Sequence, residues 1–301
     1  MKLSCTLGGY GDLKYQIGFT KACGFDACDF PMGGVFGKNG RLGDIDNVTD
    51  QMIYDFFMPM REEADRVGLE FGQTHSVGGG RLKDEDWDDM VKREIAVIKA
   101  TKILGAKYTA MHPIMYRERI YDKYVEENFE KAALFFERLT PALEENDVYG
   151  CLENMFAYDR VYKFYCPTIF STAEEIVKMC DRLGDRYQIC LDIGHSVLGG
   201  EDPVHMAHVC GKRVKILHTH DNDGLGDLHT FPFSRHRAHT GNPMRIDWTL
   251  VMRALNDIGY EGNLNFESGA PGPREINQAG YEYLAAIGRY LVSLRENDLG
   301  C

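Results

Sequence analysis

The chain has 301 residues, 44% of them hydrophobic, and its 34 Lys and Arg against 46 Asp and Glu give a formal net charge of −12. This length and hydrophobic content suffice for one large core, so we expect a single domain of barrel size over residues 1–301. The acidic balance, without a run of basic residues that could follow a phosphate backbone, argues against nucleic-acid partners.

The ends and the cysteines of the chain indicate its compartment. Met1 to Thr6 enters a strand pattern at once, without the apolar stretch of a signal peptide, and no run is long enough to cross a membrane. Nine scattered cysteines form no C-x-x-C pair, which is typical of reduced thiols that pack as small apolar side chains. We therefore expect a cytoplasmic protein with no membrane partner.

Short apolar runs rich in β-branched and aromatic residues alternate with longer segments of helical period. The predicted strands are, in chain order, Lys2–Thr6, Phe25–Phe30, Leu69–His75, Tyr108–His112, Tyr149–Asn154, Tyr187–Ile193, Val214–His220 and Asn263–Ser268. Amphipathic helices are expected between them, and the segment Ile276–Glu296 closes the series. A βα unit repeated eight times in about 250 to 300 residues is typical of an α/β fold, the (β/α)₈ TIM barrel. A doubly wound open sheet is the alternative, but no strand ends in a glycine-rich phosphate-binding motif.

In such a barrel the chemistry lies at the carboxyl ends of the strands, where this sequence places metal-binding residue types. From the third strand to the eighth, these residues are His75, His112, Glu153, Asp192 with His195, His218 with His220 and Asp221, and Glu267. One histidine at a strand end is more often a hydrogen-bonded structural residue. Six consecutive strands that all end in a metal-binding residue type are not explained in that way. Buried carboxylates aimed at one axis are expected to need a cation between them. Imidazole and carboxylate donors without cysteine favour a hard or borderline divalent ion over a closed structural zinc site.

The order Glu on the fifth strand, Asp-x-x-His on the sixth, His-x-x-Asp on the seventh and Glu on the eighth resembles the xylose-isomerase-like TIM barrel superfamily. That superfamily includes ketose 3-epimerases, hydroxypyruvate isomerases, inosose dehydratases and apurinic-site endonucleases. The resemblance implies a metal-dependent isomerase or epimerase of a sugar or sugar derivative. It also implies one divalent ion (Mn²⁺, Mg²⁺, Co²⁺ or Zn²⁺) whose ligands are Glu153, Asp192, His218 and Glu267.

The choice of ligand on the seventh strand rests on that resemblance. His218 and His220 share one face by alternation, so alternation alone does not choose between them. The three-residue offset from His218 to Asp221 resembles the ligand register of the family, so His218 is preferred and His220 is the fallback. The same resemblance implies that His195 contacts the substrate.

A second motif, Asp227-Leu-His229, resembles the D-x-H segment that holds an additional metal in the apurinic-site endonucleases. His75 and His112 also stand where those endonucleases place ligands. We assign these four residues, together with His220, to substrate binding, and a second ion at Asp227 and His229 is the alternative. A multinuclear nuclease is the corresponding alternative function, but the loops of the active face carry too few Lys and Arg for a DNA enzyme.

The sequence departs from the ketose 3-epimerases in one respect. Those enzymes carry an arginine shortly after the seventh-strand histidine, whereas here the segment begins Asn222-Asp223-Gly224 and the nearest arginines are Arg235 and Arg237. Aromatic residues after Glu153 could form the wall of a sugar site, pack in the core or contact another subunit: Phe156, Tyr158 and Tyr162. The sequence is compatible with a homo-oligomer.

The proposed ligands suggest a mechanism. A metal that holds a ketose carbonyl and the neighbouring hydroxyl favours removal of the α-proton and stabilises the enediolate. Glu153 and Glu267 are then expected to remove and return the proton. Epimerisation, aldose-ketose isomerisation and dehydration all begin in this way, and the sequence does not separate them. A non-catalytic barrel that binds a ligand or a partner subunit is a third class. The expected substrate is a small carbohydrate that is unphosphorylated or singly charged, because no phosphate-binding motif is present.

Overall fold

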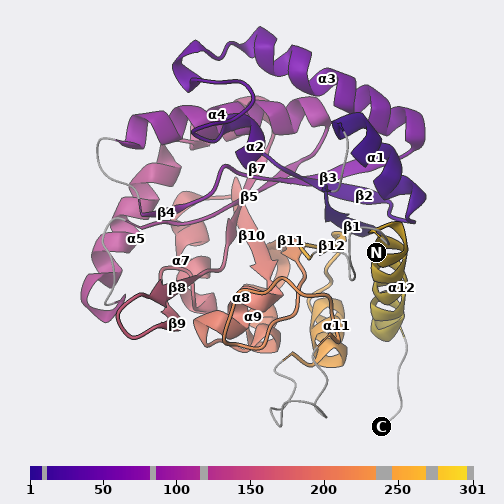
Figure 1. The fold of residues 1–301 in the computed structure, drawn as a ribbon. Helices are drawn as coiled ribbons and strands as arrows, with labels where there is room; N and C mark the ends of the chain where they lie inside the picture. Colours follow the sequence, from indigo (N-terminus) through magenta and orange to yellow (C-terminus); the bar gives the residue numbers. More distant parts are fainter. Residues whose placement is uncertain (9–11, 82–85, 116–120, 235–245, 269–276, 297–301) are drawn as a thin grey trace.

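The computed structural model describes residues 1–8, 12–81, 86–115, 121–234, 246–268 and 277–296. Eight parallel strands form a nearly closed barrel surrounded by helices, which is a single-domain TIM-barrel fold (Figure 1). Around the barrel the strands are β1 (Leu3–Thr6), β2 (Ala27–Pro31), β3 (Glu70–His75), β5 (Tyr108–Met111), β7 (Tyr149–Glu153), β10 (Tyr187–Asp192), β11 (Val214–His218) and β12 (Leu264–Phe266). Every predicted strand is confirmed, with boundaries that differ by two residues at most.

The barrel closes between β11 and β12 through a contact just beyond β11. Thr219 forms a parallel bridge with Phe266. The Thr219 N–H donates to the Asn265 carbonyl oxygen at 2.8 Å, and the Glu267 N–H donates to the Thr219 carbonyl oxygen at 3.3 Å. This closure brings the last residues of the seventh and eighth barrel strands together.

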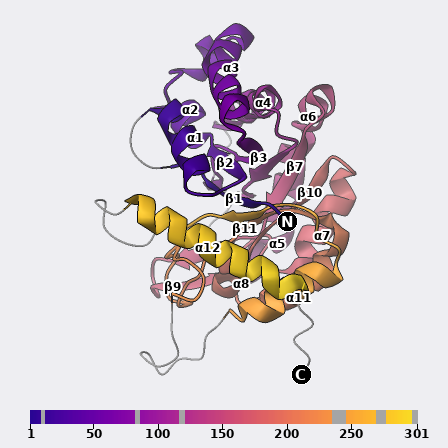
Figure 2. The ribbon, with the colours of Figure 1, turned by 90° about the vertical axis from the view of Figure 1, so that its right-hand side faces the viewer.

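Helices cover the outside of the barrel. The helices that follow the eight barrel strands are α1 (Leu13–Ala22), α3 (Asp50–Val67), α4 (Trp87–Leu104), α5 (Tyr121–Glu137) with α6 (Thr140–Asn146), α7 (Ala173–Leu183), α9 (Pro203–Cys210), α11 (Trp248–Asp257) and α12 (Asn277–Glu296). Shorter helical segments are α2 (Gly33–Phe36), η1 (Ile45–Asn47), α8 (Ile193–Gly199) and η3 (Gly211–Arg213). Helix α12 lies beside β1 and the N-terminus (Figure 2). In the described ranges, no helix combines the length and the hydrophobicity needed to span a bilayer.

Local sequence signals set several helix boundaries. The Thr49 hydroxyl accepts a hydrogen bond from the Met52 N–H at the start of α3, which satisfies one of the free donors of the first turn. Helices α3 and α4 end at Gly68 and Gly105, whose φ angles of 73° and 81° are left-handed. Glycine adopts this conformation without the steric strain of a Cβ, so both helices stop where the sequence places it.

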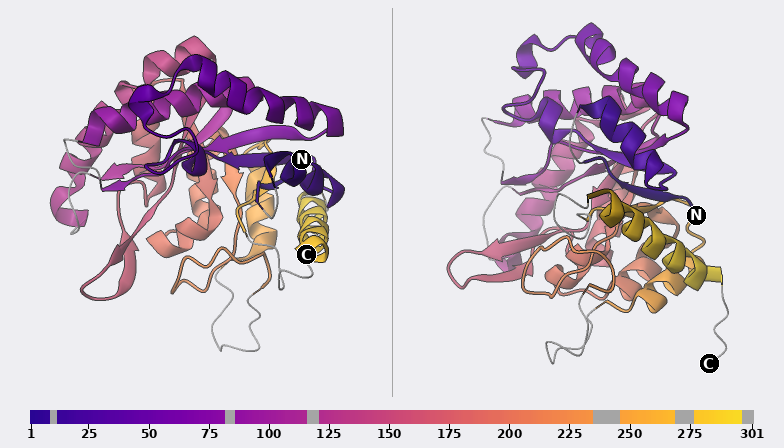
Figure 3. Two further views of the ribbon diagram at one scale, coloured as in Figure 1. Left: turned by 45° about the horizontal axis from the view of Figure 1, so that its top comes forward. Right: turned by 45° about the vertical axis from the view of Figure 1, so that its right-hand side comes forward.

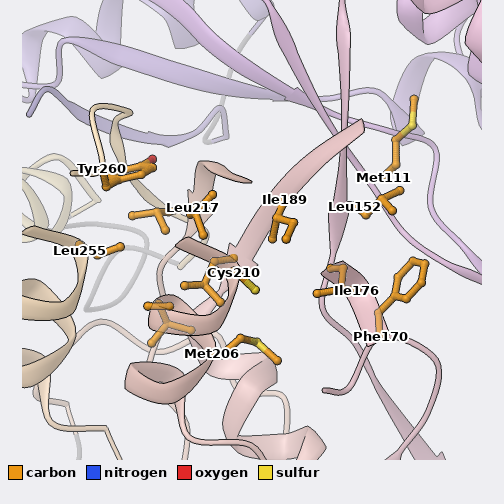
Figure 4. Close-up of a cluster of buried hydrophobic side chains, with 14 of the residues drawn as sticks. Met111, Leu152, Phe170, Ile176, Ile189, Met206, Cys210, Leu217, Leu255 and Tyr260 are labelled. Carbon is orange, nitrogen blue, oxygen red and sulfur yellow. The ribbon is translucent and has the colours of Figure 1, made fainter. Parts of the chain in front are cut away.

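The main core lies between the barrel wall and the helices. Figure 4 shows outward-facing strand residues such as Leu152 and Ile189 near Ile176 of α7. All three side chains are fully buried. Hydrophobic burial of this kind fixes the strands against the helices, and the strands in turn fix the residues at their carboxyl ends.

Two small additional sheets form within the loops at the carboxyl ends of the barrel strands. Strands β8 (Phe156–Asp159) and β9 (Phe164–Pro167) form an antiparallel hairpin that protrudes from the barrel (Figure 3). Strands β4 (Gly80–Arg81) and β6 (Ile114–Met115) pair in parallel and join the loops that follow β3 and β5. This pairing ties the described parts of the two loops together.

Candidate active site

Strand alternation explains why polar side chains gather at one end of the barrel. A small buried layer takes one residue from each of four neighbouring strands: Ala110, Cys151, Cys190 and Ile216. Successive side chains of a strand point to opposite faces, so the residues two positions further along point into the barrel as well. Those residues are His112, Glu153, Asp192 and His218. The metal-binding residue types thus lie directly above an apolar floor.

Four of these side chains form what we call the inner group: Glu153, Asp192, His218 and Glu267. One donor atom from each lies within 4.8 Å of the others. The His218 Nδ1 atom is 3.1 Å from Glu153 Oε1, 3.2 Å from Glu267 Oε2 and 3.9 Å from Asp192 Oδ2. The side chains of Glu153, Asp192 and His218 are fully buried, and that of Glu267 is 15% exposed. The inner group therefore holds three carboxylates around one imidazole, away from water.

Several donor atoms of the inner group have no hydrogen-bond partner among the described residues. They are both carboxylate oxygens of Glu153, Oδ2 of Asp192, Oε2 of Glu267 and Nδ1 of His218. Buried polar atoms are normally paired, and buried carboxylates without partners are costly. A divalent ion would satisfy all of these atoms at once, so the residues present fit a metal ion with carboxylate and imidazole ligands.

The His75 and His112 side chains flank the inner group. The two Nε2 atoms are 2.9 Å apart, and His112 Nε2 lies 3.1 Å from Glu153 Oε2. On the other side, His75 Nδ1 lies 3.3 Å from Glu267 Oε1. One donor atom from each of His75, His112 and Glu153 lies within 4.8 Å of the other two, so these residues could also hold an ion. His112 therefore contacts Glu153, and His75 contacts both Glu267 and, at 3.7 Å, Glu153.

A second set of donors, the outer group, consists of His195, His220, Asp227 and His229, again within 4.8 Å of one another. The Nδ1 atoms of His195 and His229 lie 3.1 Å and 2.7 Å from the carbonyl oxygens of Asn154 and Glu267. A carbonyl oxygen can only accept, so both Nδ1 atoms carry the hydrogen and each Nε2 lies on the other side of its ring. These Nε2 atoms face Asp227 at 3.8 Å and 3.1 Å. An imidazole whose second nitrogen donates to a carbonyl is the usual form of a metal-ligating histidine.

The loop that carries Asp227 and His229 is closed at its base. Asp221 and Thr230 exchange two backbone hydrogen bonds, of 2.7 Å and 3.0 Å, and the Thr230 hydroxyl donates to the Asp221 carbonyl oxygen. The Asp221 carboxylate accepts a hydrogen bond from the Trp248 indole at 3.3 Å. Asp221 therefore anchors the loop to α11 and belongs to neither group of donors.

All ten predicted site residues thus lie in one continuous cluster at the carboxyl ends of the strands. The aromatic residues after Glu153 separate into two kinds. The Phe156 ring packs edge to face against the His195 ring, with centroids 4.9 Å apart. Tyr158 and Tyr162 are 44% and 75% exposed on the hairpin, so they are not core residues. Arg235 and Arg237 lie outside the described residues.

Sequence reasoning missed Asp29, which is fully buried on β2. Its Oδ2 atom lies 3.3 Å from His218 Nε2 and accepts a hydrogen bond from the Gln73 side chain at 3.3 Å. A carboxylate behind a histidine fixes the orientation of its ring, here with Nδ1 of His218 toward the inner group. The available signal was an acidic residue within an apolar strand, but Asp29 does not stand at the predicted strand end.

Glu94 of α4 was also missed, because a helical glutamate is usually exposed. Its side chain is 3% exposed and accepts hydrogen bonds from the Ser76 hydroxyl and the Val77 N–H, directly after His75. Burial raises the pKa of this carboxyl to about 8, against the opposing effect of these hydrogen bonds. Glu94 is therefore protonated at neutral pH and supports the loop after β3.

We expect Glu94→Gln to stabilise the protein at pH 8 relative to the wild type. A raised carboxyl pKa means that the unfolded chain loses this proton near pH 4.5 while the folded chain keeps it to about pH 8, so stability falls across that interval. Glutamine has no proton to lose, and the expected gain is on the order of 3 kcal/mol. Urea unfolding at pH 5 and pH 8 measures it. Equal stability differences at the two pH values would contradict the assignment.

Without a metal ion, the charges of the site should make stability depend on pH. Asp192 and Glu153 outweigh the effect of burial on His195 and raise its pKa to about 10, and Asp227 and Glu267 raise that of His229 to about 9. The stability from these histidines is complete below pH 6.5 and is lost as the pH rises through 9 to 10.

The carboxylates of the site affect the folding stability at acidic pH. Burial would raise the pKa of Glu153, but His218 and His112 outweigh it and hold the pKa well below its usual range. The ionised Glu153 carboxylate therefore adds to the folding stability above pH 4.5, and this stability is lost as the pH falls. Urea unfolding in chelator is therefore expected to show maximal stability between about pH 4.5 and 6.5. A stability that keeps rising to pH 9 would contradict this.

Comparisons with known proteins agree with the fold. The model of a family described as xylose isomerase-like TIM barrel matches residues 17–287. The structure of D-psicose 3-epimerase with D-tagatose from Clostridium cellulolyticum H10 has a TM-score of 0.68 and 16% identity, over 97% of this chain and 99% of that chain. The apo 3-keto-D-glucoside 4-epimerase from E. coli has a TM-score of 0.67 and 12% identity, over 95% and 98%. An inosose dehydratase from Geobacillus kaustophilus (strain HTA426) is 34% identical over 62 residues, so the match spans 20% of each chain.

Proposed function

Because the chain belongs to the xylose isomerase-like TIM barrel family, we propose that it is a divalent-metal-dependent isomerase or epimerase of a sugar or sugar derivative. The observation that carries this proposal is the inner group, whose buried carboxylate oxygens and His218 Nδ1 converge without hydrogen-bond partners. The small-molecule class of the substrate is supported by the sugar enzymes among the similar proteins and by the net charge of −12.

The proposed ligands are Glu153, Asp192, His218 and Glu267. When bound there, a Mn²⁺, Mg²⁺, Co²⁺ or Zn²⁺ ion supplies Lewis-acid polarisation of the substrate carbonyl. Glu153 and Glu267 both lie within 3.2 Å of His218 Nδ1. Both carboxylates can therefore reach a substrate that is held beside the inner group. One of them removes the α-proton and the other returns a proton to the substrate.

The remaining histidines and Asp227 are assigned to the substrate. His75 and His112 contact the two catalytic carboxylates, so they can orient these groups and donate to substrate hydroxyls. His195 lies 3.2 Å from Glu153 Oε1, next to the Phe156 ring. His229 Nδ1 lies 3.9 Å from Glu267 Oε2 of the inner group, and the Asp227 N–H donates to the Tyr165 hydroxyl of the hairpin at 3.5 Å. A polar rim with one aromatic side suits a polyhydroxylated ligand.

The test combines metal analysis with a panel of ketoses and keto-inositols incubated in D₂O. The expected result is stoichiometric divalent metal and incorporation of deuterium at the α-carbon of one substrate. Product analysis then separates epimerisation and isomerisation from loss of water. Protein that binds no divalent ion, or that exchanges no α-proton of any panel member at full metal loading, would overturn the proposal.

A multinuclear metallohydrolase is the second candidate, because the outer group and the His75, His112 and Glu153 set offer further positions for ions. The metal count and binding to abasic duplex DNA distinguish it from the first candidate. The acidic balance of the chain favours the sugar enzyme, since electrostatic attraction supplies most of the affinity for nucleic acids.

A further inference from the structure

His220 is assigned to substrate binding only as one of several histidines and has no step of its own in the mechanism above, yet its side chain is fully buried in the site. Neither ring nitrogen has a partner with hydrogen-bond geometry among the described residues. The Nε2 atom lies 3.1 Å from Asp192 Oδ1, and the ring stacks on His229 with centroids 4.1 Å apart and planes 13° from parallel. His220 therefore contacts one member of the inner group and one member of the outer group.

Distance alone would make His220 a metal ligand, because it lies within 4.8 Å of His195, Asp227 and His229. Ring geometry excludes this when His229 is a ligand of the same ion. An imidazole binds a metal ion through a lone pair that lies in the plane of the ring. Two stacked rings with nearly parallel planes share no nearby point that lies in both planes, so one ion cannot meet the in-plane lone pairs of both rings. When His229 is a ligand, His220 therefore acts in another way.

The space for His220 is provided by Gly194, the second residue of α8. A Cβ atom built on Gly194 would lie 2.1 Å, 2.4 Å and 2.6 Å from three atoms of the His220 ring. The ring thus occupies the position that any larger residue would fill. The Asn222 side chain donates a hydrogen bond of 2.7 Å to the Gly194 carbonyl oxygen and holds the two segments together.

We propose that His220 is a positioning residue that links the two groups, and that the absence of a side chain at Gly194 is what admits it. The His220 Nε2 atom holds Asp192 Oδ1 by a polar contact of 3.1 Å, and the same oxygen accepts a hydrogen bond from the His195 N–H at 2.6 Å. Asp192 Oδ2 is thereby turned toward His218 and left without a partner. The face of the ring supports His229. This inference rests on the proposed metal site and adds two residues on which its affinity depends.

The test is a double-mutant cycle read by Mn²⁺ affinity, measured by calorimetry on the full chain. Gly194→Ala and His220→Ala are each expected to weaken Mn²⁺ binding by roughly 10- to 100-fold, the usual effect of losing a group that orients a ligand. The double variant should bind no more weakly than His220→Ala, because the ring displaced by the new methyl group is already gone. Gly18→Ala in α1 is the matched control, since nothing lies within 4 Å of its Cβ position.

Two further variants separate the two contacts of His220. His220→Gln keeps an N–H donor at a similar reach and should restore most of the affinity. His220→Phe keeps the ring face toward His229 but has no donor for Asp192, so its affinity should stay low. Thermal unfolding in chelator checks that each variant folds, and these two variants of similar size carry the test if Gly194→Ala does not fold.

The outcomes that overturn the inference are distinct from those that overturn the function. If Gly194→Ala weakens Mn²⁺ binding further in the His220→Ala background, its effect comes from α8 and not from His220. If His220→Phe binds Mn²⁺ like the wild type, the contact to Asp192 has no role. In both cases the proposed enzyme stands and only the positioning role fails, whereas a wild type that binds none of Mn²⁺, Mg²⁺, Co²⁺ and Zn²⁺ removes both.

Discussion

Glu153→Gln and Glu267→Gln are each expected to lower turnover by roughly 10² or more while most of the metal stays bound. Glutamine keeps the size of the side chain and one oxygen that can act as a ligand, but it cannot accept a proton. Both glutamates lie within 3.2 Å of His218 Nδ1, so either substitution leaves the other glutamate in place as the single base. Steady-state kinetics with metal analysis of the same preparations measures the effect.

The two variants should also differ from each other. If one glutamate serves each face of the substrate carbon, each variant is expected to keep deuterium exchange on the face served by the remaining base. Glu62→Gln on the exposed side of α3 is the matched control and should leave turnover unchanged. Near-wild-type turnover of both site variants would contradict proton transfer. Reaction in D₂O without label in the product would point instead to a hydride shift.

Strand alternation made most of the site predictable from the sequence. The strand bounds are accurate to within two residues, and the side chains at the strand ends follow from a period of two. This is why residues as distant in the chain as His75 and Glu267 were expected together, and they lie 3.3 Å apart. The family resemblance is confirmed by the match over residues 17–287. The metal ligands and catalytic roles stay predictions.

The remaining features depend on contacts across the barrel that no local pattern records. Asp29 reaches His218 because β2 faces β11 through the barrel interior, and nothing near Asp29 in the sequence indicates this partner. In the sequence Gly194 resembles any residue near the start of a helix, and only the structure shows that the His220 ring packs against it. Glu94 has the position of a surface residue in α4, and only the loop after β3 buries it. Burial of a polar group depends on tertiary packing, which periodicity does not encode.

Asp192→Ala is expected to abolish stoichiometric metal binding and with it turnover. Asp192 has two functions in the structure, since Oδ2 faces His218 in the inner group and Oδ1 caps α8 through the His195 N–H. Removing the side chain therefore deletes a ligand and a helix cap together, and the loss of such a cap costs about 1 kcal/mol by itself. A lower stability alone would not identify the ligand.

Asp192→Asn separates the two functions, because it keeps an oxygen for the His195 N–H and removes the negative charge. In chelator this variant should unfold near the wild-type temperature, whereas Asp192→Ala should unfold at a lower one. In Mn²⁺ the wild type should gain stability, by about 4 kcal/mol when the free ion is 1,000 times Kd. Neither variant should gain as much, because a ligand that binds only the folded state stabilises by an amount that grows with the logarithm of the ratio of free ligand to Kd. Stoichiometric metal and full activity in Asp192→Ala would show that the ion lies elsewhere, and the outer group would be the next place to look for it.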